Sequence, residues 1–191
     1  MVVHTGILRF IFILGIVCCL QSCSSTPKYT YSKTKTHSDT SKDAKLREVI
    51  VTLGRELIGT PYRKGGKTEK GFDCSGLVIY VCGRMDIDLA SCAADQAKCG
   101  KTVSLDHAKP GDLIYFGQKG HIHHVGIISV NQKSNLSIIH SSSSQGVIEE
   151  NILKSDYWIK RIKLIKDLSS YPRDKRISQN DTSTKPIYYC P

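Results

Sequence analysis

The chain is poor in acidic residues. It has 17 Asp and Glu against 27 Lys and Arg, which gives a formal net charge of +10 over 191 residues. This imbalance favours an anionic partner, either nucleic acid or an anionic cell envelope, and carries no information about the fold. Since the sequence contains no nucleic-acid-binding motif, we expect no nucleic-acid partner and predict a protein of the envelope.

The apolar stretch at the N-terminus is too short to span a bilayer. Its eleven mostly apolar residues, 10–20, follow a weakly basic start, as in the core of a signal peptide. Residues 20–23, LQSC, resemble a bacterial lipobox, in which Cys23 becomes the diacylated first residue. A signal peptide cleaved nearby without lipidation is the alternative. We predict a lipoprotein signal peptide over 1–22 and an anchored, non-spanning protein.

Polar segments without hydrophobic periodicity flank one central domain. Residues 23–42 are rich in Ser, Thr and Lys with almost nothing to bury, so we predict a lipidated Cys23 followed by a flexible tether. Residues 169–191 are polar and contain proline, which predicts a C-terminal tail. The remaining residues, 43–168, are enough for one domain with its own core. No internal repeat is visible.

Helical periodicity comes first in this domain and strand patterns follow. We predict a helix from a cap at Ser41 or Asp43 to Gly59, a second over 74–83 and a shorter third over 90–98. From Pro110 onwards, short β-branched or aromatic segments alternate with turn sequences; the predicted strands are DLIYF, HIHHVGIISV, LSIIH and YWIKRIKLI. This order predicts an α+β fold, with N-terminal helices packed on an antiparallel sheet of about five strands.

Cys74 opens the second predicted helix, in the stretch FDCSGLVIY. A nucleophilic cysteine acts as the thiolate and needs an imidazole that accepts and returns its proton. The N-terminus of a helix supplies partial positive charge and free N–H groups that can receive an oxyanion. The position of Cys74 alone favours a buried structural cysteine. Whether Cys74 is instead a nucleophile depends on whether a histidine lies near it.

Four of the seven histidines fall on two adjacent predicted strands: His121, His123, His124 and His140. Strand alternation places His124 on one face with Ile122, and His121 and His123 on the opposite face. Only one of these faces can point toward Cys74. We therefore interpret His121 and His123 as surface histidines.

The pairing of the two strands determines whether His124 meets His140. If Val130 and Leu136 flank a five-residue turn, Gly126 lies opposite His140. His124 and His140 are then diagonal neighbours on one face, roughly 7–8 Å apart by backbone. This arrangement suits a His124 that acts as the base and a His140 that orients it, although a slip of one residue would separate them.

A zinc site is the competing interpretation of these histidines. The HIHH run places its members on opposite faces of a strand, and the sequence contains no HExxH helix. We therefore predict no metal and no cofactor.

Four segments together resemble a known family: GTPYRKGGKTEKGFDCSGLV, PGDLIYF, HHVGII and IIHSSSSQGV, in this order, within residues 46–165. They are similar to the NlpC-type cell-wall endopeptidases, which are papain-like cysteine peptidases of bacteria. The layout looks most like the small murein endopeptidase lipoproteins of Gram-negative bacteria. The resemblance implies a papain-like fold with Cys74 as nucleophile, His124 as base and His140 as the third polar residue.

The resemblance also implies residues that seat the peptide substrate: Tyr62, Asp73 and Ser75. Helix capping is an equally good explanation for Asp73, and core packing is an alternative for Tyr62. The segment LASCAADQ departs from the family pattern, because Ala90, Ser91 and Cys92 stand where proline, arginine and a hydroxyl residue are frequent. That segment borders the substrate groove in the family, so the departure puts bond specificity in doubt.

Four cysteines remain after those of the signal peptide, the lipid site and the nucleophile: Cys82, Cys92, Cys99 and Cys190. Cys92 and Cys99 lie two turns apart on a predicted helix, about 10 Å, which is too far for a disulfide. A bridge from Cys82 to either of them is open, and free thiols are the alternative.

The predicted function is peptidoglycan hydrolysis by a monomeric, lipid-anchored peptidase, on the periplasmic face of the outer membrane because no Asp follows Cys23. The bond is either the γ-D-glutamyl link to the diamino acid or the D,D crosslink between stems. Two alternatives remain open: a non-catalytic envelope-binding lipoprotein on the same fold, and another acyl-transfer enzyme on the same scaffold.

Overall fold

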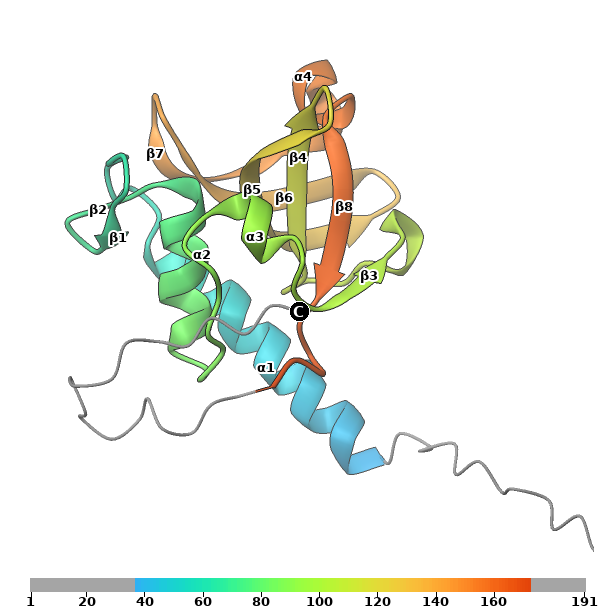
Figure 1. Ribbon diagram of the computed structural model, residues 1–191. Helices are drawn as coiled ribbons and strands as arrows, with labels where there is room; N and C mark the ends of the chain where they lie inside the picture. The colour runs from blue at the N-terminus through green and yellow to red at the C-terminus, as the bar shows by residue number, and fades with distance from the viewer. Residues whose placement is uncertain (1–36, 173–191) are drawn as a thin grey trace, which may run out of the picture. The chain divides into compact units, whose positions relative to one another are not determined.

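The computed structural model describes residues 37–172 (Figure 1). The signal peptide, Cys23, most of the predicted tether and the tail from residue 173 lie outside this range. The helices are α1 (His37–Glu56), α2 (Cys74–Gly83), α3 (Ala93–Gln96) and α4 (Asp156–Ile159), with 3-10 turns η1 (Leu105–His107) and η2 (Ile152–Lys154). In the described part of the chain, no helix combines the length and apolarity needed to cross a bilayer.

Six strands form one antiparallel sheet in the order β3-β8-β4-β5-β6-β7. They are β3 (Lys101–Val103), β4 (Leu113–Gln118), β5 (His121–Gln132), β6 (Asn135–Ser142), β7 (Gly146–Asn151) and β8 (Ile162–Asp167). A separate hairpin joins β1 (Lys67–Thr68) to β2 (Gly71–Phe72). The α+β class is confirmed, and the sheet has one strand more than the expected five.

Helices α1 and α2 lie side by side against the sheet, and together they bury its inner face (Figure 1). Leu77, Val78 and Val81 of α2 are fully buried there, as the helical spacing predicts. The other face of the sheet carries a second apolar cluster around Phe116 and Ile138. Because α2 is packed so tightly, its first residue, Cys74, has a fixed position relative to the strands.

The ends of two helices differ from the sequence-based prediction. Helix α1 begins at His37, ahead of the expected cap at Ser41 or Asp43, so residues 37–42 are helical and not part of the predicted tether. A helix whose later turns are packed can extend through a polar stretch, because propagation adds one hydrogen bond per residue. Helix α3 covers only Ala93–Gln96 of the stretch predicted as the third helix.

The register between β5 and β6 agrees with the prediction near His140, where Ile127 pairs with Ile139 and Ile128 with Ile138. The turn itself is shorter than expected, because the ladder continues to the pair Gln132 and Asn135. A β-bulge just after Ile128 absorbs the difference. The predicted five-residue turn is therefore wrong, while the register that matters for the histidines is right.

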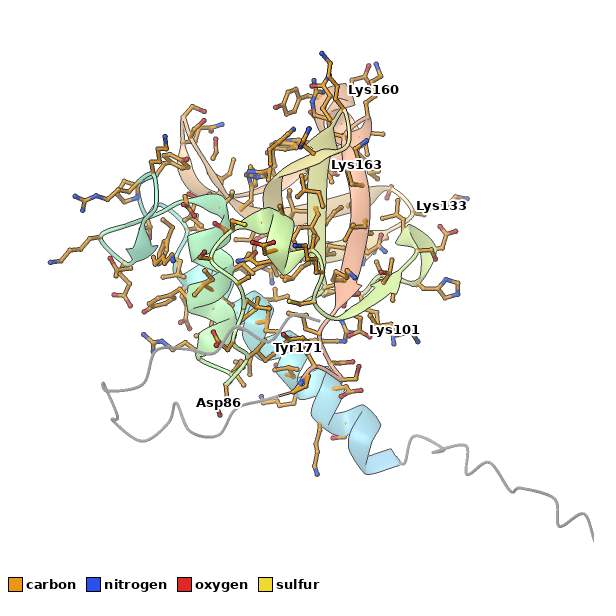
Figure 2. All side chains as sticks on the ribbon, viewed as in Figure 1. Asp86, Lys101, Lys133, Lys160, Lys163 and Tyr171 are labelled. Atoms are coloured by element: carbon orange, nitrogen blue, oxygen red, sulfur yellow. The ribbon has the colours of Figure 1, made fainter. Side chains whose placement is uncertain are left out.

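Basic side chains lie on the outside of the domain. Figure 2 shows Lys133 and Lys160 at its periphery, pointing away from the ribbon. Arg47 of α1, by contrast, is largely buried and forms ion pairs with Asp112 and Asp167, which tie the helix to the sheet. The positive charge of these two lysines thus lies on the surface rather than in the core.

Candidate active site

Asp73 caps the helix that begins at Cys74. Its carboxylate accepts hydrogen bonds from the backbone N–H of Gly76, at 2.7 Å, and from that of Gly65, at 2.9 Å. The Ser75 hydroxyl lies 3.0 Å from the same carboxylate. The capping role expected for Asp73 is confirmed, and the cap joins the first turn of α2 to the loop around Gly65.

The segment that departs from the family pattern supports this first turn. The buried Ser75 hydroxyl also lies 3.2 Å from the Ser91 carbonyl oxygen. The buried Gln96 side-chain amide donates to the carbonyl oxygens of Ser75, at 3.2 Å, and Ala90, at 2.9 Å. The LASCAADQ segment therefore holds α2 in place through backbone carbonyls, a contact that survives changes in the side chains at Ala90 and Ser91.

The Cys74 thiol lies against strand β5. Burial raises the pKa of this thiol, and the Asp73 charge raises it further. Hydrogen bonds from the backbone N–H groups of Val125, Ser75 and Cys74 itself oppose the rise, because they stabilise the thiolate. Since Val125 directly follows His124 in the chain, this hydrogen bond places Cys74 beside the segment of β5 that carries His124.

The two histidines predicted to be neighbours are hydrogen bonded. Nε2 of His124 lies 2.9 Å from Nδ1 of His140, and the two rings meet edge to face. His140 is almost fully buried on β6, and its Nε2 lies 2.8 Å from Oε1 of Glu150 on β7. Three neighbouring strands thus contribute one polar side chain each to a continuous chain of hydrogen bonds.

Glu150 and Trp158 complete this arrangement and were not predicted. The Trp158 indole N–H donates to the same Glu150 oxygen at 2.9 Å. Its ring stacks on His124, with centroids 5.0 Å apart and planes 29° apart. The sequence pattern predicts no strand at residues 146–151, where the structure has β7. With this strand, the same diagonal argument finds Glu150, because Ile148 lies opposite His140 and Glu150 is two residues further along.

A β-bulge corrects the predicted faces of strand β5. His124 lies opposite Phe116 on β4 whereas Ile122 lies opposite Gly117, so His123 is an extra residue. The bulge shifts the alternation by one position. Ile122 consequently packs against the inner core, and His123 lines the same cavity as His124. His123 is exposed, as expected of a surface histidine, but its predicted separation from the cavity of His124 is wrong.

These side chains surround one cavity of about 370 Å³, lined by Tyr62, Cys74, His123, His124, His140, Ser141, Ser142, Ser143, Tyr157 and Trp158. The nucleophile candidate and both imidazoles open into it, and Tyr62 is 37% exposed at its wall. Asp73 and Ser75 do not line it, since both are engaged in the turn described above. A thiol, an imidazole pair and a helix N-terminus in one cavity are the elements that acyl transfer through a thioester requires.

Comparison with known proteins identifies the family, because residues 59–167 match the NlpC/P60 family. The chain belongs to the NlpC/P60 family. The probable endopeptidase NlpC of Escherichia coli K12 is 35% identical over 164 residues, which cover 80% of this chain and 95% of that protein. The γ-DL-glutamyl hydrolase of Bacillus subtilis 168 is 39% identical over 112 residues, 58% of this chain, which spans only 27% of that protein.

A solved structure supports the same assignment. The NlpC/p60 domain of peptidoglycan hydrolase SagA is 28% identical, with a TM-score of 0.54 over 63% of this chain and 97% of that domain. The predicted papain-like α+β fold and the predicted NlpC-type cysteine peptidase are both confirmed. Among residues 37–172, no three or more His, Cys, Asp and Glu side chains are arranged to hold a metal ion.

The remaining cysteines of this NlpC/P60 domain differ in state. Cys82 and Cys92 are free thiols, as is Cys74, whereas Cys99 is disulfide-bonded. Neither of the bridges from Cys82 that the sequence left open is formed. Full burial raises the pKa of Cys82 to about 12, so this thiol stays protonated at neutral pH.

Burial of His124 makes the stability of the NlpC/P60 domain depend on pH. Desolvation, together with the neighbouring His140 and His123, lowers the pKa of His124 from 6.5 to about 3. The unfolded chain binds this proton more readily, so the stabilisation is complete above pH 6.5 and is lost as the pH falls toward 3. We expect the free energy of unfolding to fall by up to about 1.4 kcal/mol per pH unit in this window.

Urea unfolding at pH 7, 6, 5 and 4 measures this dependence. His124→Gln should flatten the slope, whereas His121→Gln, which replaces an exposed histidine on the same strand, should leave it unchanged. Equal slopes in the wild type and in His124→Gln would show that His124 is not buried in its neutral form.

Proposed function

We propose that the protein is a peptidoglycan endopeptidase that hydrolyses amide bonds in murein stem peptides or crosslinks. The observation that carries this proposal is the single cavity that Cys74 shares with the hydrogen-bonded pair His124 and His140. Membership of the NlpC/P60 family supports it, as do relatives named as an endopeptidase and a γ-DL-glutamyl hydrolase. The formal charge of +10 suits an anionic envelope polymer.

The reaction begins with an uncharged pair. Burial raises the pKa of Cys74 and lowers that of His124, so at neutral pH the resting site contains a thiol and a neutral imidazole. The thiol proton passes to His124 as the sulfur attacks the amide carbonyl carbon. The Cys74 backbone N–H, which has no partner within the helix because it lies in the first turn of α2, helps to hold the oxyanion. Because His124 is cationic only after this transfer, its positive charge forms only as the oxyanion develops.

The two remaining steps return the enzyme to its starting state. His124 gives its proton to the leaving amine as the carbon–nitrogen bond breaks, which leaves a thioester on Cys74. His124 then takes a proton from water, whose oxygen attacks the thioester carbonyl. The released carboxylic acid and the reprotonated thiol complete the cycle without a cofactor.

Substrate contacts and anchoring are further parts of the proposal. Tyr62, half-exposed at the cavity wall, is placed to contact the peptide. Asp73 and Ser75 would act on the substrate through the position of the helix end that they fix. Cys23 in LQSC would carry the lipid and hold a monomeric enzyme on the periplasmic face of the outer membrane.

Mass spectrometry of purified muropeptides after digestion tests the function and identifies the bond. Cleavage of a γ-D-glutamyl link shortens a monomeric stem, whereas cleavage of a D,D crosslink converts a dimer into two monomers. Products whose stems end at D-glutamate would assign the first bond, and monomers with intact stems released from dimers would assign the second. Unaltered monomers and dimers after prolonged incubation would contradict the proposal and favour a binding protein on the same fold.

A further inference from the structure

Glu150 occupies a position that the reaction scheme above does not use. Its Oε1 receives two hydrogen bonds, from Nε2 of His140 at 2.8 Å and from the Trp158 indole at 2.9 Å. An ionised carboxylate can only accept hydrogen bonds, and an indole can only donate. Both partners must therefore present an N–H to this oxygen, which means that His140 carries a proton on Nε2.

The proton on Nε2 of His140 determines the state of the next ring. Burial lowers the pKa of His140, so the ring is neutral near pH 7 and its Nδ1 has no proton. That bare nitrogen lies 2.9 Å from Nε2 of His124 and accepts a hydrogen bond from it. His124 then holds its own single proton on Nε2, and its Nδ1 keeps a free lone pair.

Only this tautomer of His124 can serve Cys74. Nε2 of His124 is committed to His140, so a proton from the thiol has to arrive at Nδ1. If His140 held its proton on Nδ1 instead, it would donate to Nε2 of His124 and leave Nδ1 of His124 protonated. The base would then be unable to accept the thiol proton, as happens when the orienting group of a catalytic triad is changed.

We infer that Glu150, held by Trp158, is a positioning residue that fixes the tautomers of His140 and His124 and so keeps His124 ready as the base. This inference rests on the proposed function. Glu150 acts through His140 and contacts neither the nucleophile nor the cavity. Trp158 has two parts in the arrangement: its N–H selects the acceptor oxygen of Glu150, and its ring stacks on His124.

The tautomers are measured directly by ¹⁵N NMR of histidine rings, in the Cys74→Ala background so that the readout does not depend on turnover. At pH 7 both His124 and His140 should show protonated Nε2 and bare Nδ1. Glu150→Ala should give both rings mixed tautomers. Glu150→Gln should restore the original pattern, because the Trp158 N–H holds the amide oxygen in the acceptor position.

Kinetics with Cys74 present supplies the second readout. Glu150→Ala should lower kcat about 10–100-fold with little change in KM, by analogy with the range found for groups that orient a metal-ligating histidine. Glu150→Gln should recover most of that loss. Glu149→Gln is the matched control on the same strand: Glu149 pairs with Arg55 at 2.8 Å and not with the histidines, so its kcat should match the wild type.

Each outcome decides the inference. Unchanged tautomers in Glu150→Ala would overturn it, and so would altered tautomers with an unchanged kcat. Circular dichroism of each variant separates a tautomer effect from unfolding, and the isosteric Glu150→Gln provides the comparison if the alanine variant does not fold. If the wild type cleaves no muropeptide, the proposed function fails, while the NMR readout still tests the tautomers.

Discussion

Replacing Cys74 with alanine is expected to abolish muropeptide cleavage while leaving the fold intact. The thiol is the only group in the cavity that can form the thioester, and removing the nucleophile of a comparable Ser–His pair lowers kcat roughly 10⁶-fold. The Cys74 side chain packs at the edge of the core and is only partly buried, so its loss leaves a small cavity that opens to solvent. Mass spectrometry of the digest and a thermal melt measure the two effects.

Cys82→Ala is the matched control for this variant. Cys82 lies two turns further along the same helix, is fully buried and has a pKa of about 12. The Cys82 thiol cannot supply a thiolate at neutral pH. The Cys82→Ala variant should therefore have a lower melting temperature, and below that temperature its kcat should be close to that of the wild type. Muropeptide cleavage by the Cys74→Ala protein at the wild-type rate would rule out covalent catalysis at this position.

The position of the two histidines in the site depends on the register between β5 and β6. The pairing of Ile127 with Ile139 places His124 and His140 on a diagonal, and it could be predicted because both strands have a clear apolar pattern. The predicted turn had the wrong length, but a bulge after Ile128 compensates for it before the ladder reaches Ile139. The register of a strand pair is determined by which apolar faces are buried. A bulge adds one residue to a strand, so the same register can be combined with turns of different lengths.

The features that sequence could not predict arise where local pattern and tertiary packing disagree. The bulge at His123 has no signature in HIHH, since strict alternation describes the same four letters equally well. Strand β7 contains Glu149 and Glu150, whose charges obscure its strand character, and packing against β6 decides its conformation. Without that strand, the link from His140 to Glu150 and Trp158 cannot be derived.

The helix that carries Cys74 was predictable for the opposite reason. An Asp before a run that begins Cys-Ser-Gly supplies a cap, and the following apolar residues specify the buried face. Local signal and tertiary packing agree there, so both the start at Cys74 and the end at Gly83 are as predicted. The catalytic core of the fold thus follows from sequence, and its supporting residues require the structure.

Replacing His124 with glutamine should lower kcat about 10²–10⁴-fold, the contribution usual for a general acid–base group. The glutamine amide cannot accept the thiol proton, yet it fills much of the imidazole volume between Trp158 and His140. Substrate binding does not require proton transfer, so KM should change little. Because Cys74 loses its base, the residual rate should rise with pH as the thiol, whose pKa is raised by burial, ionises on its own.

That pH dependence distinguishes a base from a structural role for His124. The wild-type rate should be nearly level from pH 7 to 9, since His124 stays neutral and accepts the proton throughout this range. In the glutamine variant the rate should increase about tenfold per pH unit, as the thiolate fraction does below its pKa. The exposed His121, changed to glutamine, should retain both the wild-type rate and its level profile. A level profile in His124→Gln would mean that another group takes the thiol proton.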